Sequence, residues 1–497
     1  MVCLFTAGTA HAEILPWLEH AVDDPFSMQK KAANQVAPSL KPDSCSVPDL
    51  KRTLTLDDVV ISALCNNPDT RAAYMSLVAQ AATYVSNYSE YLPNASVTGS
   101  RTRTTTFPPA NPVSVTTTTV NGNTTTTTNT GTITTAVSGS YGLSLGMTLY
   151  DFGQREFKIE TAELAFLAAG HTYNSTLQGA ISSALQGYYS LLNAQNALIV
   201  ARESEQFAKE SYDAAVLRHK IGQVALVDEL QAKNNYSQAQ LGTESAENAL
   251  VLQQAALAQL MGFSPDMPVQ VADIDDKTLA KDPFGGRVQG LMEEAKEKRH
   301  DLLASRDSLK SSEASYEALK RSDLATITAT TNMGVTNDSA HIFNPSGTRT
   351  QGIGVNVSIP IFTGFSQTYN EHAAEKSLEA QRESLITTER NVEASVWNSW
   401  HNYETAKISW KTSQDQIASA IQLKDVALGQ YKEGLNSILD VLNAQLQYST
   451  ALQSQLQTRY NLLTTRVSLV QSVGVLDLES MNPEAVLDNA AANIPTN

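Results

Sequence analysis

The chain has 497 residues, of which 42% are apolar, so it can bury a sizeable core and is not disordered by composition. Its 51 acidic and 35 basic side chains leave a formal charge of -16, which argues against a protein that works on nucleic acid or on anionic lipid. No run of about 18 uninterrupted apolar residues occurs, which excludes a helical membrane span and leaves a membrane β-barrel open, because barrel strands give a much weaker signal.

The first twelve residues are typical of the apolar end of a secretory signal. Small residues stand at both positions of an Ala-x-Ala cleavage site, Ala10 and Ala12, so we expect the mature chain to begin at Glu13. The basic start of such a signal is missing, and we expect the translation start to lie upstream. An ordinary N-terminal strand is the alternative interpretation.

The mature chain would keep two cysteines, Cys45 and Cys65, because Cys3 falls inside the signal segment. An even pair in an exported protein is more often a disulfide than two free thiols, so we predict a Cys45–Cys65 disulfide. No His or further Cys flanks either position at ligand spacing, and no two of the eight histidines have metal spacing on a helix face. We therefore expect no metal site and no cofactor, with the histidines scattered over the surface.

An internal duplication sets the expected organisation of the chain. Residues 176–262 match residues 388–474 at an offset of 212, and residues 63–69 match 295–301 at an offset of 232. The longer match pairs Leu185 with Trp397, Tyr188 with Trp400, Gly222 with Gly434, Asp228 with Asp440, Ala232 with Ala444 and Tyr236 with Tyr448. The offset changes mostly before Gly153, where the first copy carries a Thr-rich insertion.

Each copy predicts a helix, a strand hairpin and two long helices. Residues 154–263 and 365–482 contain no proline, and their apolar residues recur at the spacing of amphipathic helices. Gly222 and Gly434 interrupt these segments at matching points, which gives helices of roughly 105 and 60 Å on the two sides of each glycine. Shorter helices are expected before the two strand hairpins, near 54–92 and 286–324. These lengths favour antiparallel coiled-coil pairs in a cylinder roughly 100 Å tall over a globular bundle.

Between the helices, apolar side chains alternate with small or polar ones. The apolar members are Tyr141, Leu143, Leu145, Met147 and Leu149 in the first copy and Ile353, Val355, Val357, Ile359 and Ile361 in the second. Weaker partner strands are expected at 95–99 and 325–329. A soluble sandwich is the more common source of such alternation, but four strands supply no second sheet. A barrel facing lipid needs at least about eight strands, so several chains would have to contribute.

Aromatic residues stand at the expected junctions between strands and helices. They are Tyr91, Tyr150, Phe152, Phe362 and Phe365, and they predict an interfacial girdle on the helical side of a barrel. The Thr-rich stretch 116–135 would be a polar loop exposed to water on the other side. A linker between domains is the alternative, which is weakened because strands of one hairpin flank the stretch.

Two other classes of protein compete with a membrane channel. An enzyme has little support, because the sequence contains no G-x-S-x-G, G-x-G-x-x-G, phosphate loop or H-E-x-x-H motif. A periplasmic coiled-coil adaptor or scaffold would keep the helices without a membrane barrel. We therefore expect a protein that is not an enzyme, with the scaffold as the alternative function.

The sequence resembles the TolC-like outer membrane efflux protein family over roughly residues 53–476. The motifs that carry this resemblance are Leu92-Pro93, the strand end 359–364, the segment 431–444 and its echo 218–228. Cys45 together with the segment 64–69 is similar to the branch that serves type I secretion of proteins. The resemblance implies a homotrimer in the bacterial outer membrane with a large periplasmic portion.

The fold class implied by the resemblance is mainly α with a membrane β-barrel. Three chains would form a periplasmic barrel of long antiparallel helical hairpins and a 12-stranded barrel with four strands per chain. The expected divisions are a signal remnant at 1–12, an N-terminal periplasmic segment at 13–52, repeat 1 at 53–275 with its strand hairpin at 94–152 and helical hairpin at 154–262, repeat 2 at 276–476 with hairpins at 325–362 and 365–474, and a tail at 477–497.

The resemblance also implies a gate at the periplasmic end of the tunnel. In that family, a Tyr and an Arg on one hairpin contact acidic or hydroxyl groups on the other. Tyr431 matches the Tyr and Asp228 the acidic acceptor, whereas Asn436 stands in place of the Arg and Val227 in place of the hydroxyl. A neutral hydrogen bond is weaker than a charged one, so a softer gate is expected. The alternative for Tyr431 is an ordinary packed helix residue.

Charged rings and docking tips follow from the same resemblance. Of two acidic rings at the aperture, Asp440 matches one, Asn443 replaces the other, and Asp228 is a further candidate. A ring of carboxylates would attract cations, although an acid near a helix N-terminus is also favoured electrostatically for its own sake. The turns around Gly222 and Gly434 are expected to dock a periplasmic adaptor.

The implied function is an outer membrane channel-tunnel that completes a tripartite export machine by passive conduction. Its partners would be a periplasmic adaptor (membrane fusion) protein, an inner membrane transporter and outer membrane lipid, with no nucleic acid. The cargo would be proteins exported by type I secretion, small molecules, or both. A water-filled tunnel leaves that selection to its partners.

Overall fold

The computed structural model describes residues 27–40, 45, 52–107, 114–120, 123–129, 133–274, 288–337 and 347–476. The chain divides into a helical unit, drawn from residues 1–82, 163–311 and 379–497, and a sheet-bearing unit, drawn from residues 83–162 and 312–378. The expected signal remnant at 1–12, mature start at Glu13 and tail at 477–497 lie outside the described residues. No helix in the described ranges combines the length and the apolar character needed to cross a membrane.

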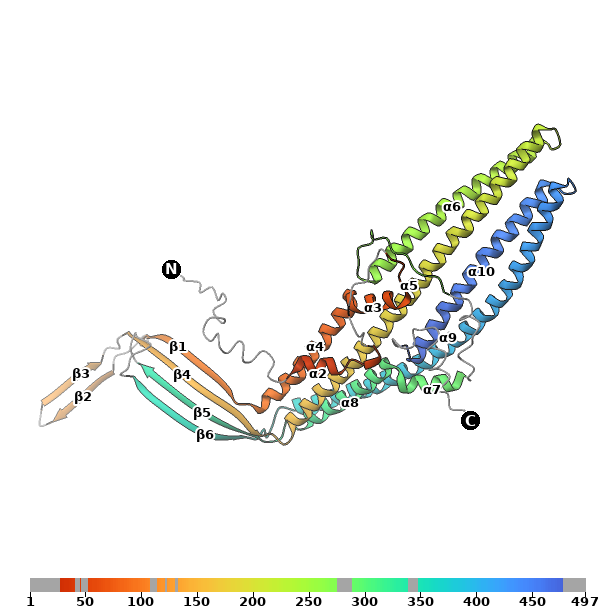
Figure 1. The fold of residues 1–497 in the computed structure, drawn as a ribbon. Coiled ribbons are helices and arrows are strands. Elements are labelled where there is room, and N and C mark those ends of the chain that lie inside the picture. Colours follow the sequence, from red (N-terminus) through yellow and green to blue (C-terminus); the bar gives the residue numbers. More distant parts are fainter. Residues whose placement is uncertain are drawn as a thin grey trace. The chain divides into compact units, whose positions relative to one another are not determined.

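The helical unit holds most of two long helical hairpins (Figure 1). One joins α5 to α6 and the other joins α9 to α10, as the proline-free segments predict. Their bounds are α5 Gln154–Lys220, α6 Leu226–Leu260, α9 Ser366–Lys432 and α10 Ile438–Val473. Helices α5 and α9 have 67 residues each, or about 100 Å at 1.5 Å per residue. The equal lengths reflect the internal duplication.

The helix before each strand hairpin is divided in two, which corrects the single helices expected near 54–92 and 286–324. The observed pairs are α3 Leu56–Asn66 with α4 Pro68–Tyr88, and α7 Val288–Lys298 with α8 His300–Lys320. Pro68 accounts for the first break, because proline lacks an N–H and disfavours helical backbone at Asn67, which is extended. Three shorter elements are α2 Met28–Asn34, η1 Pro38–Leu40 and η2 Ser89–Tyr91.

Both breaks pack against the end of a long hairpin. Gly262 follows α6 and Gly474 follows α10, with positive φ angles of 79° and 85°. A Cβ on Gly262 would lie 2.5 Å from the Asn66 carbonyl oxygen, and one on Gly474 would lie 2.9 Å from the Cα of Arg299. Only glycine fits such close contacts in this backbone conformation, so each hairpin ends against the break between two short helices.

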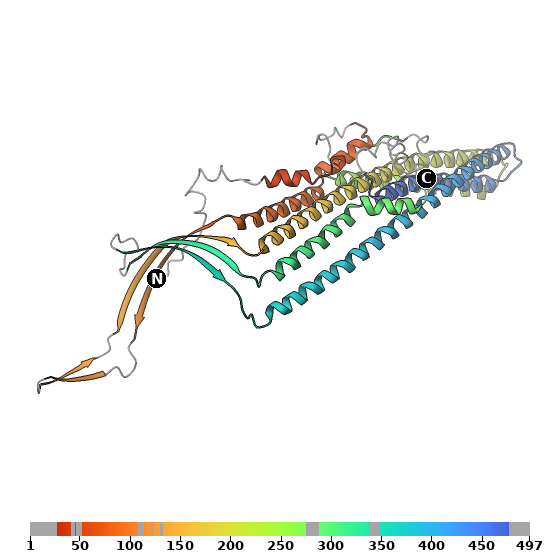
Figure 2. The same ribbon diagram turned by 90° about the horizontal axis from the view of Figure 1, so that it is seen from below.

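The sheet-bearing unit contains four long strands in one antiparallel sheet of order β1-β4-β5-β6 (Figure 2). Their bounds are β1 Asn94–Thr106, β4 Thr134–Tyr150, β5 Thr326–Asn337 and β6 Thr348–Ser358. The central pairing joins the two repeats, with Leu145 of β4 opposite Thr331 of β5. Strand β6 ends at Ser358 instead of continuing to Ile361, because Pro360 has no N–H for a further ladder bond.

The Thr-rich insertion forms further strands, which differs from the loop expected at 116–135. Strands β2 Ser114–Val120 and β3 Asn123–Asn129 pair as a separate antiparallel sheet. Threonine is β-branched and favours extended backbone. The intervening sequence Asn121-Gly122 is a strong hairpin-turn signal that the expectation of a loop overlooked.

The main apolar core lies in the helical unit, where residues of α3, α5, α7, α8, α9, α10 and the end of α6 meet. Its most deeply buried members include Ile181, Tyr188, Leu191, Leu257 and Leu469. Burying a side chain of this size stabilises a fold by about 1.5–3 kcal/mol. This core therefore holds the long helices against one another along their length, and it does not include the turns that join them.

Candidate functional site

The turns that join the long helices, here called the hairpin tips, use the same backbone geometry. Gly222 follows α5 with φ 75°, and Gly434 follows α9 with φ 79°. In each tip the glycine N–H donates to the carbonyl three residues earlier, at 2.9 and 3.0 Å, and the next N–H donates to the carbonyl five residues earlier, at 2.9 Å. Both are Schellman motifs, whose left-handed position favours glycine.

The helix after each tip begins differently. Ser437 caps α10 and forms a capping box with Asp440, whose Oδ2 accepts from the Ser437 N–H at 3.1 Å and from its hydroxyl at 2.7 Å. The matching residue before α6 is Ala225, which makes no side-chain cap. Both carboxylates stand in the first turn of a helix. Asp440 is exposed there, and Asp228 is half-buried.

Tyr431 lies at the contact between the two tips. Only 2% of it is exposed, and it packs in an apolar cluster with Ile438 and Val441 of α10 and Phe207 of α5. Arg218 of α5 donates from Nη1 to the Tyr431 carbonyl at 2.8 Å, and its guanidinium carbon lies 4.6 Å from the centre of the Tyr431 ring. In the sequence, Arg218 is only the first residue of the repeated segment 218–228, and no local signal pointed to this contact.

In the described part of the chain, none of the other expected gate residues is hydrogen-bonded to the Tyr431 hydroxyl. Asn436 donates from Nδ2 to Oε1 of Gln430, on the same hairpin, at 2.9 Å. Asn443 is exposed and lines a cavity of about 640 Å³ together with side chains of α5, α6 and α10. Within the described residues, the buried Tyr431 hydroxyl has no hydrogen-bond partner, so Asp228 does not accept from it.

A row of polar contacts joins α5 to α10 in antiparallel order. Gln178 donates to the Gly474 carbonyl at 2.9 Å, and Asn196 donates to the Tyr460 hydroxyl at 2.6 Å. Nearer the tips, Gln445 donates to the Ser204 carbonyl at 3.2 Å. Gln445 is 5% exposed, and a buried amide costs stability unless it is hydrogen-bonded. The row thus sets the register between the two hairpins.

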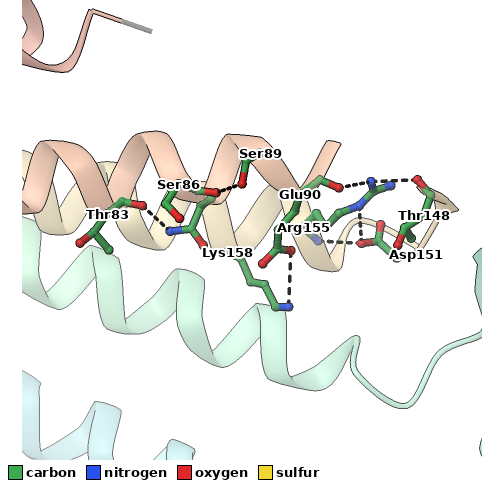
Figure 3. Close-up of polar contacts among 9 residues, drawn as sticks. Thr83, Ser86, Ser89, Glu90, Thr148, Asp151, Arg155 and Lys158 are labelled. Atoms are coloured by element: carbon green, nitrogen blue, oxygen red, sulfur yellow. Dashed lines mark hydrogen bonds and ion pairs between the residues drawn. The ribbon is translucent and has the colours of Figure 1, made fainter. Parts of the chain in front are cut away.

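A buried ion pair holds the junction between β4 and α5 (Figure 3). Arg155 Nε donates to Asp151 Oδ2 at 2.8 Å, and the two side chains are 7% and 9% exposed. Nη1 also donates to the carbonyls of Glu90 and Thr148, at 3.1 and 3.0 Å. The guanidinium carbon lies 4.4 Å from the centre of the Tyr91 ring. One arginine therefore joins η2, β4 and α5.

The junction between β6 and α9 replaces that ion pair with neutral contacts. Gln367, at the position matching Arg155, donates to the Leu319 carbonyl at 2.8 Å. Phe152 in the first junction and Phe365 in the second both have positive φ, at 55° and 63°. Both rings are exposed, and each lies edge-on to a neighbouring ring. The aromatic residues expected at the junctions are therefore at the surface of this chain.

Two histidines that are 129 residues apart meet, which corrects the expectation of scattered histidines. Nδ1 of His171 on α5 lies 3.2 Å from Nδ1 of His300 on α8, and the rings are nearly stacked. Asp307 Oδ2 lies 3.6 Å from His171 Nε2. Burial is the main cause that lowers the pKa of both imidazoles below 6.5. No group of three or more His, Cys, Asp or Glu in the described ranges is arranged to hold a metal ion.

The structure joins Cys45 to Cys65 in a disulfide, with their Cα atoms 5.6 Å apart. Cys65 belongs to α3, so this bond ties the segment before α3 to the helical unit. A loop of this length would contribute roughly 3 kcal/mol to the free energy of unfolding.

Comparisons with known proteins agree on one family. The family model described as outer membrane efflux protein matches residues 59–263 and 291–475. Protein CyaE of Bordetella pertussis is 22% identical over 342 residues, which are 67% of this chain and 70% of that protein. Outer membrane protein TolC of Escherichia coli is 23% identical over 326 residues, which are 62% of this chain and 64% of TolC.

A third relative is the toluene efflux pump outer membrane protein TtgC of Pseudomonas putida, 23% identical over 433 residues, or 84% of this chain and 82% of TtgC. Among solved structures, CusC has a TM-score of 0.71 over 88% of this chain and 98% of CusC. The CmeC outer membrane channel of Campylobacter jejuni has a TM-score of 0.70 over 89% and 90%. Both are 19% identical, so the likeness shows the fold, a mainly helical chain with an antiparallel sheet.

Proposed function

The chain belongs to the outer membrane efflux protein family, and we propose that it is a channel-tunnel of the bacterial outer membrane that completes a tripartite export machine. It conducts passively from the periplasm to the exterior, with the helical hairpins in the periplasm. Passive conduction makes and breaks no covalent bond, so we assign no catalytic residue.

The observation that carries this proposal is the uncovered apolar face of the sheet. On β6, Ile353, Val355 and Val357 are 89%, 67% and 56% exposed. The opposite face carries hydroxyl pairs, with Ser96 2.7 Å from Ser144 of the neighbouring strand. A large exposed apolar face marks an interface, and an apolar outside with a polar inside is the pattern of a barrel in lipid.

The edges of the sheet support association with further chains. Strands β1 and β6 are its two outer strands, and each has one side without a partner in the described sheet. Unpaired N–H and C=O groups are costly in lipid, so the edges must pair with other chains. If β6 of one chain pairs with β1 of the next, three chains of four strands close a barrel of twelve. The scaffold alternative leaves the apolar face without a role.

The exposed aromatic pairs suit the boundary between lipid and water. Tyr150 and Phe152 have ring centres 4.8 Å apart, and Phe362 and Phe365 have ring centres 5.4 Å apart. Aromatic side chains are favoured at the headgroup level of a membrane. We therefore place the junctions at the periplasmic face of the outer membrane, with lipid headgroups around them.

At the tips, we propose adaptor docking at Gly222 and Gly434 and a gate near Tyr431. Three-fold symmetry would gather the carboxylates of Asp440, and those of Asp228, into rings that attract cations. Asn443 adds no charge. The inner membrane transporter and its adaptor would supply the energy and select the cargo.

The cargo we favour is protein exported by type I secretion, because Cys45 and the segment 64–69 are similar to the branch of the family that serves this pathway. Efflux of small molecules is the second candidate, since the relative TtgC is a toluene efflux pump component. Deleting the gene and measuring the secreted proteins and the drug tolerance of the same strain would separate the two.

The test of the channel itself uses protein extracted from outer membranes. We expect an oligomer whose gel mobility changes on heating and which conducts ions in planar bilayers. A soluble monomer in the periplasmic fraction would support the scaffold instead. Replacing Val355 and Val357 with Asp should prevent assembly in the membrane, whereas Ser96→Thr and Ser144→Thr should be tolerated, because they keep the polar face polar.

A further inference from the structure

Arg218 joins the two hairpins of one chain at their tips. Arg218 belongs to the last turn of α5, and Tyr431 belongs to the last turn of α9. The guanidinium of Arg218 donates to the Tyr431 carbonyl at 2.8 Å and lies against the face of its ring, 4.6 Å from the ring centre. Arg218 thus contacts the opposite hairpin through both the main chain and the side chain of one residue.

The position of the carbonyl explains why a cation is favoured there. The last carbonyls of a helix lack partners within the helix and carry the negative end of its dipole. The Tyr431 carbonyl accepts from the Gly434 N–H at 3.0 Å, which leaves one lone pair for Arg218. A Cβ on Gly434 would lie 3.3 Å from Nη2 of Arg218, so the glycine of the tip also leaves room for the guanidinium.

The contact depends on the ring and the carbonyl of Tyr431, not on its hydroxyl. The hydroxyl is buried and has no hydrogen-bond partner in the described part of the chain. The ring is held by the apolar cluster with Ile438, Val441 and Phe207, so it cannot easily move away from Arg218. Asn436, the gate residue expected from the sequence, bonds within its own hairpin and does not join the two.

We propose that Arg218 is a positioning residue that clasps the two hairpin tips and holds the periplasmic mouth of the tunnel in its narrow state. This inference rests on the proposed channel function. Widening the mouth requires one hairpin to move relative to the other, and the clasp opposes that movement. Its loss shifts the balance toward the wide state by the strength of a charged hydrogen bond and a cation–π contact together.

Conductance of the full-length trimer in planar bilayers tests the clasp. Arg218→Gln should raise the fraction of time spent in the high-conductance state at least about fivefold. Arg218→Lys should lie between wild type and Arg218→Gln, because lysine keeps the charge and loses the planar fork. Arg202→Gln is the matched control, since Arg202 lies on the same helix and pairs with Glu247 of its own hairpin at 2.7 Å.

Substitutions of Tyr431 separate the ring from the hydroxyl. Tyr431→Phe should conduct like wild type, and Tyr431→Leu should lie between wild type and Arg218→Gln, because leucine removes the ring but keeps the main-chain carbonyl. The double variant Arg218→Gln with Tyr431→Leu should conduct like Arg218→Gln alone, because that substitution already removes both contacts of the guanidinium. Unchanged conductance in Arg218→Gln, or a large effect of Tyr431→Phe, would overturn the clasp.

A second measurement does not depend on channel activity. Amide hydrogen exchange in the same trimers should be faster at residues 433–437 in Arg218→Gln than in Arg202→Gln. Equal exchange rates would contradict the clasp. A wild-type trimer that shows no conductance but does show this difference would refute the proposed function and support the clasp.

Discussion

The two hairpin tips carry aspartate at matching positions, but only one of the two aspartates takes part in a helix cap. Asp440 shares a capping box with Ser437, whereas Asp228 follows Ala225, whose methyl group can form no cap. The glycine turns before them are nearly identical in backbone geometry. Duplication has therefore kept the turn and the charge, and one hydroxyl distinguishes the two helix starts.

An aspartate at the start of a helix can cap that helix or can contribute charge to a ring, and the sequence alone does not distinguish these two roles. At the second tip, Asp440 has a local structural role at the start of α10, in addition to any role in a charged ring. At the first tip, Asp228 has the helix dipole but no such capping partner in Ala225. A test of the proposed rings must therefore remove the charge at each tip without removing the cap.

The largest expected effect, a loss of export, comes from disrupting the glycine turn that the two tips share. Gly222→Val together with Gly434→Val should abolish export while leaving trimers in the membrane, because valine resists positive φ and deforms both turns. Export of the cargo and trimer content of the outer membrane are the measurements.

The matched control for those variants is Gly429→Val. Gly429 lies inside α9, and a Cβ there would meet no atom within 4 Å. Export should persist in this variant. If the double tip variant also exports normally, the tips do not dock the adaptor.

The next effect removes charge from one tip at a time. Asp440→Asn should weaken block by trivalent cations, applied from the periplasmic side, by about tenfold, or ~1.4 kcal/mol. With Asn443 already neutral, one substitution should remove most of the block. Planar-bilayer titrations of Asp440→Asn and Asp228→Asn measure it, and an effect confined to Asp228→Asn would move the aperture charge to the first tip.

A smaller effect exchanges the caps and leaves the charges in place. Ser437→Ala should destabilise the start of α10 by about 1 kcal/mol, because it removes the cap that Asp440 completes. Ala225→Ser should stabilise the start of α6 by a similar amount, since Asp228 stands ready at the third position. Amide exchange should become faster at residues 438–441 in Ser437→Ala and slower at residues 226–229 in Ala225→Ser. Exchange rates that change in the same direction in both variants would contradict the proposed difference between the two caps.

The smallest effect concerns the histidine pair, away from the tips. Burial lowers the pKa of His171 and His300, while Asp307 and Asp301 favour their charged forms and Lys310 opposes that of His171. Because the folded pKa values lie below 6.5, the unfolded chain binds more protons than the folded one as pH falls through that value. The free energy of unfolding should therefore decrease below about pH 6.5 and level off below the lowered pKa values.

Thermal unfolding of trimers between pH 7 and 5 measures this dependence. His171→Asn should reduce this dependence but not abolish it, because burial still lowers the pKa of His300. His372→Asn should leave it unchanged, since His372 is an exposed residue of α9 and does not contact the pair. A pH dependence identical in wild type and His171→Asn would exclude the pair as its source.

Local signals in the sequence were sufficient for much of this molecule. Proline-free segments predicted the long helices, the repeated glycines predicted the tips, and alternation predicted the four strands of the main sheet. The break at Pro68 and the pairing of β2 with β3 had equally clear signals in the sequence, Pro68 itself and the pair Asn121-Gly122, and both were missed because neighbouring patterns outweighed them. The second break, before His300, has no proline, and only its packing against Gly474 explains it.

By itself, the sequence determined the periodic elements, the turns and the family, because each depends on residues that are near one another along the chain or repeated at a fixed offset. Only the tertiary structure decided which side chains meet across hundreds of residues. Arg218 and Tyr431 are 213 positions apart, and His171 and His300 are 129 apart. Such pairs arise from the register between long helices, which is set by the summed packing of a buried core rather than by any motif.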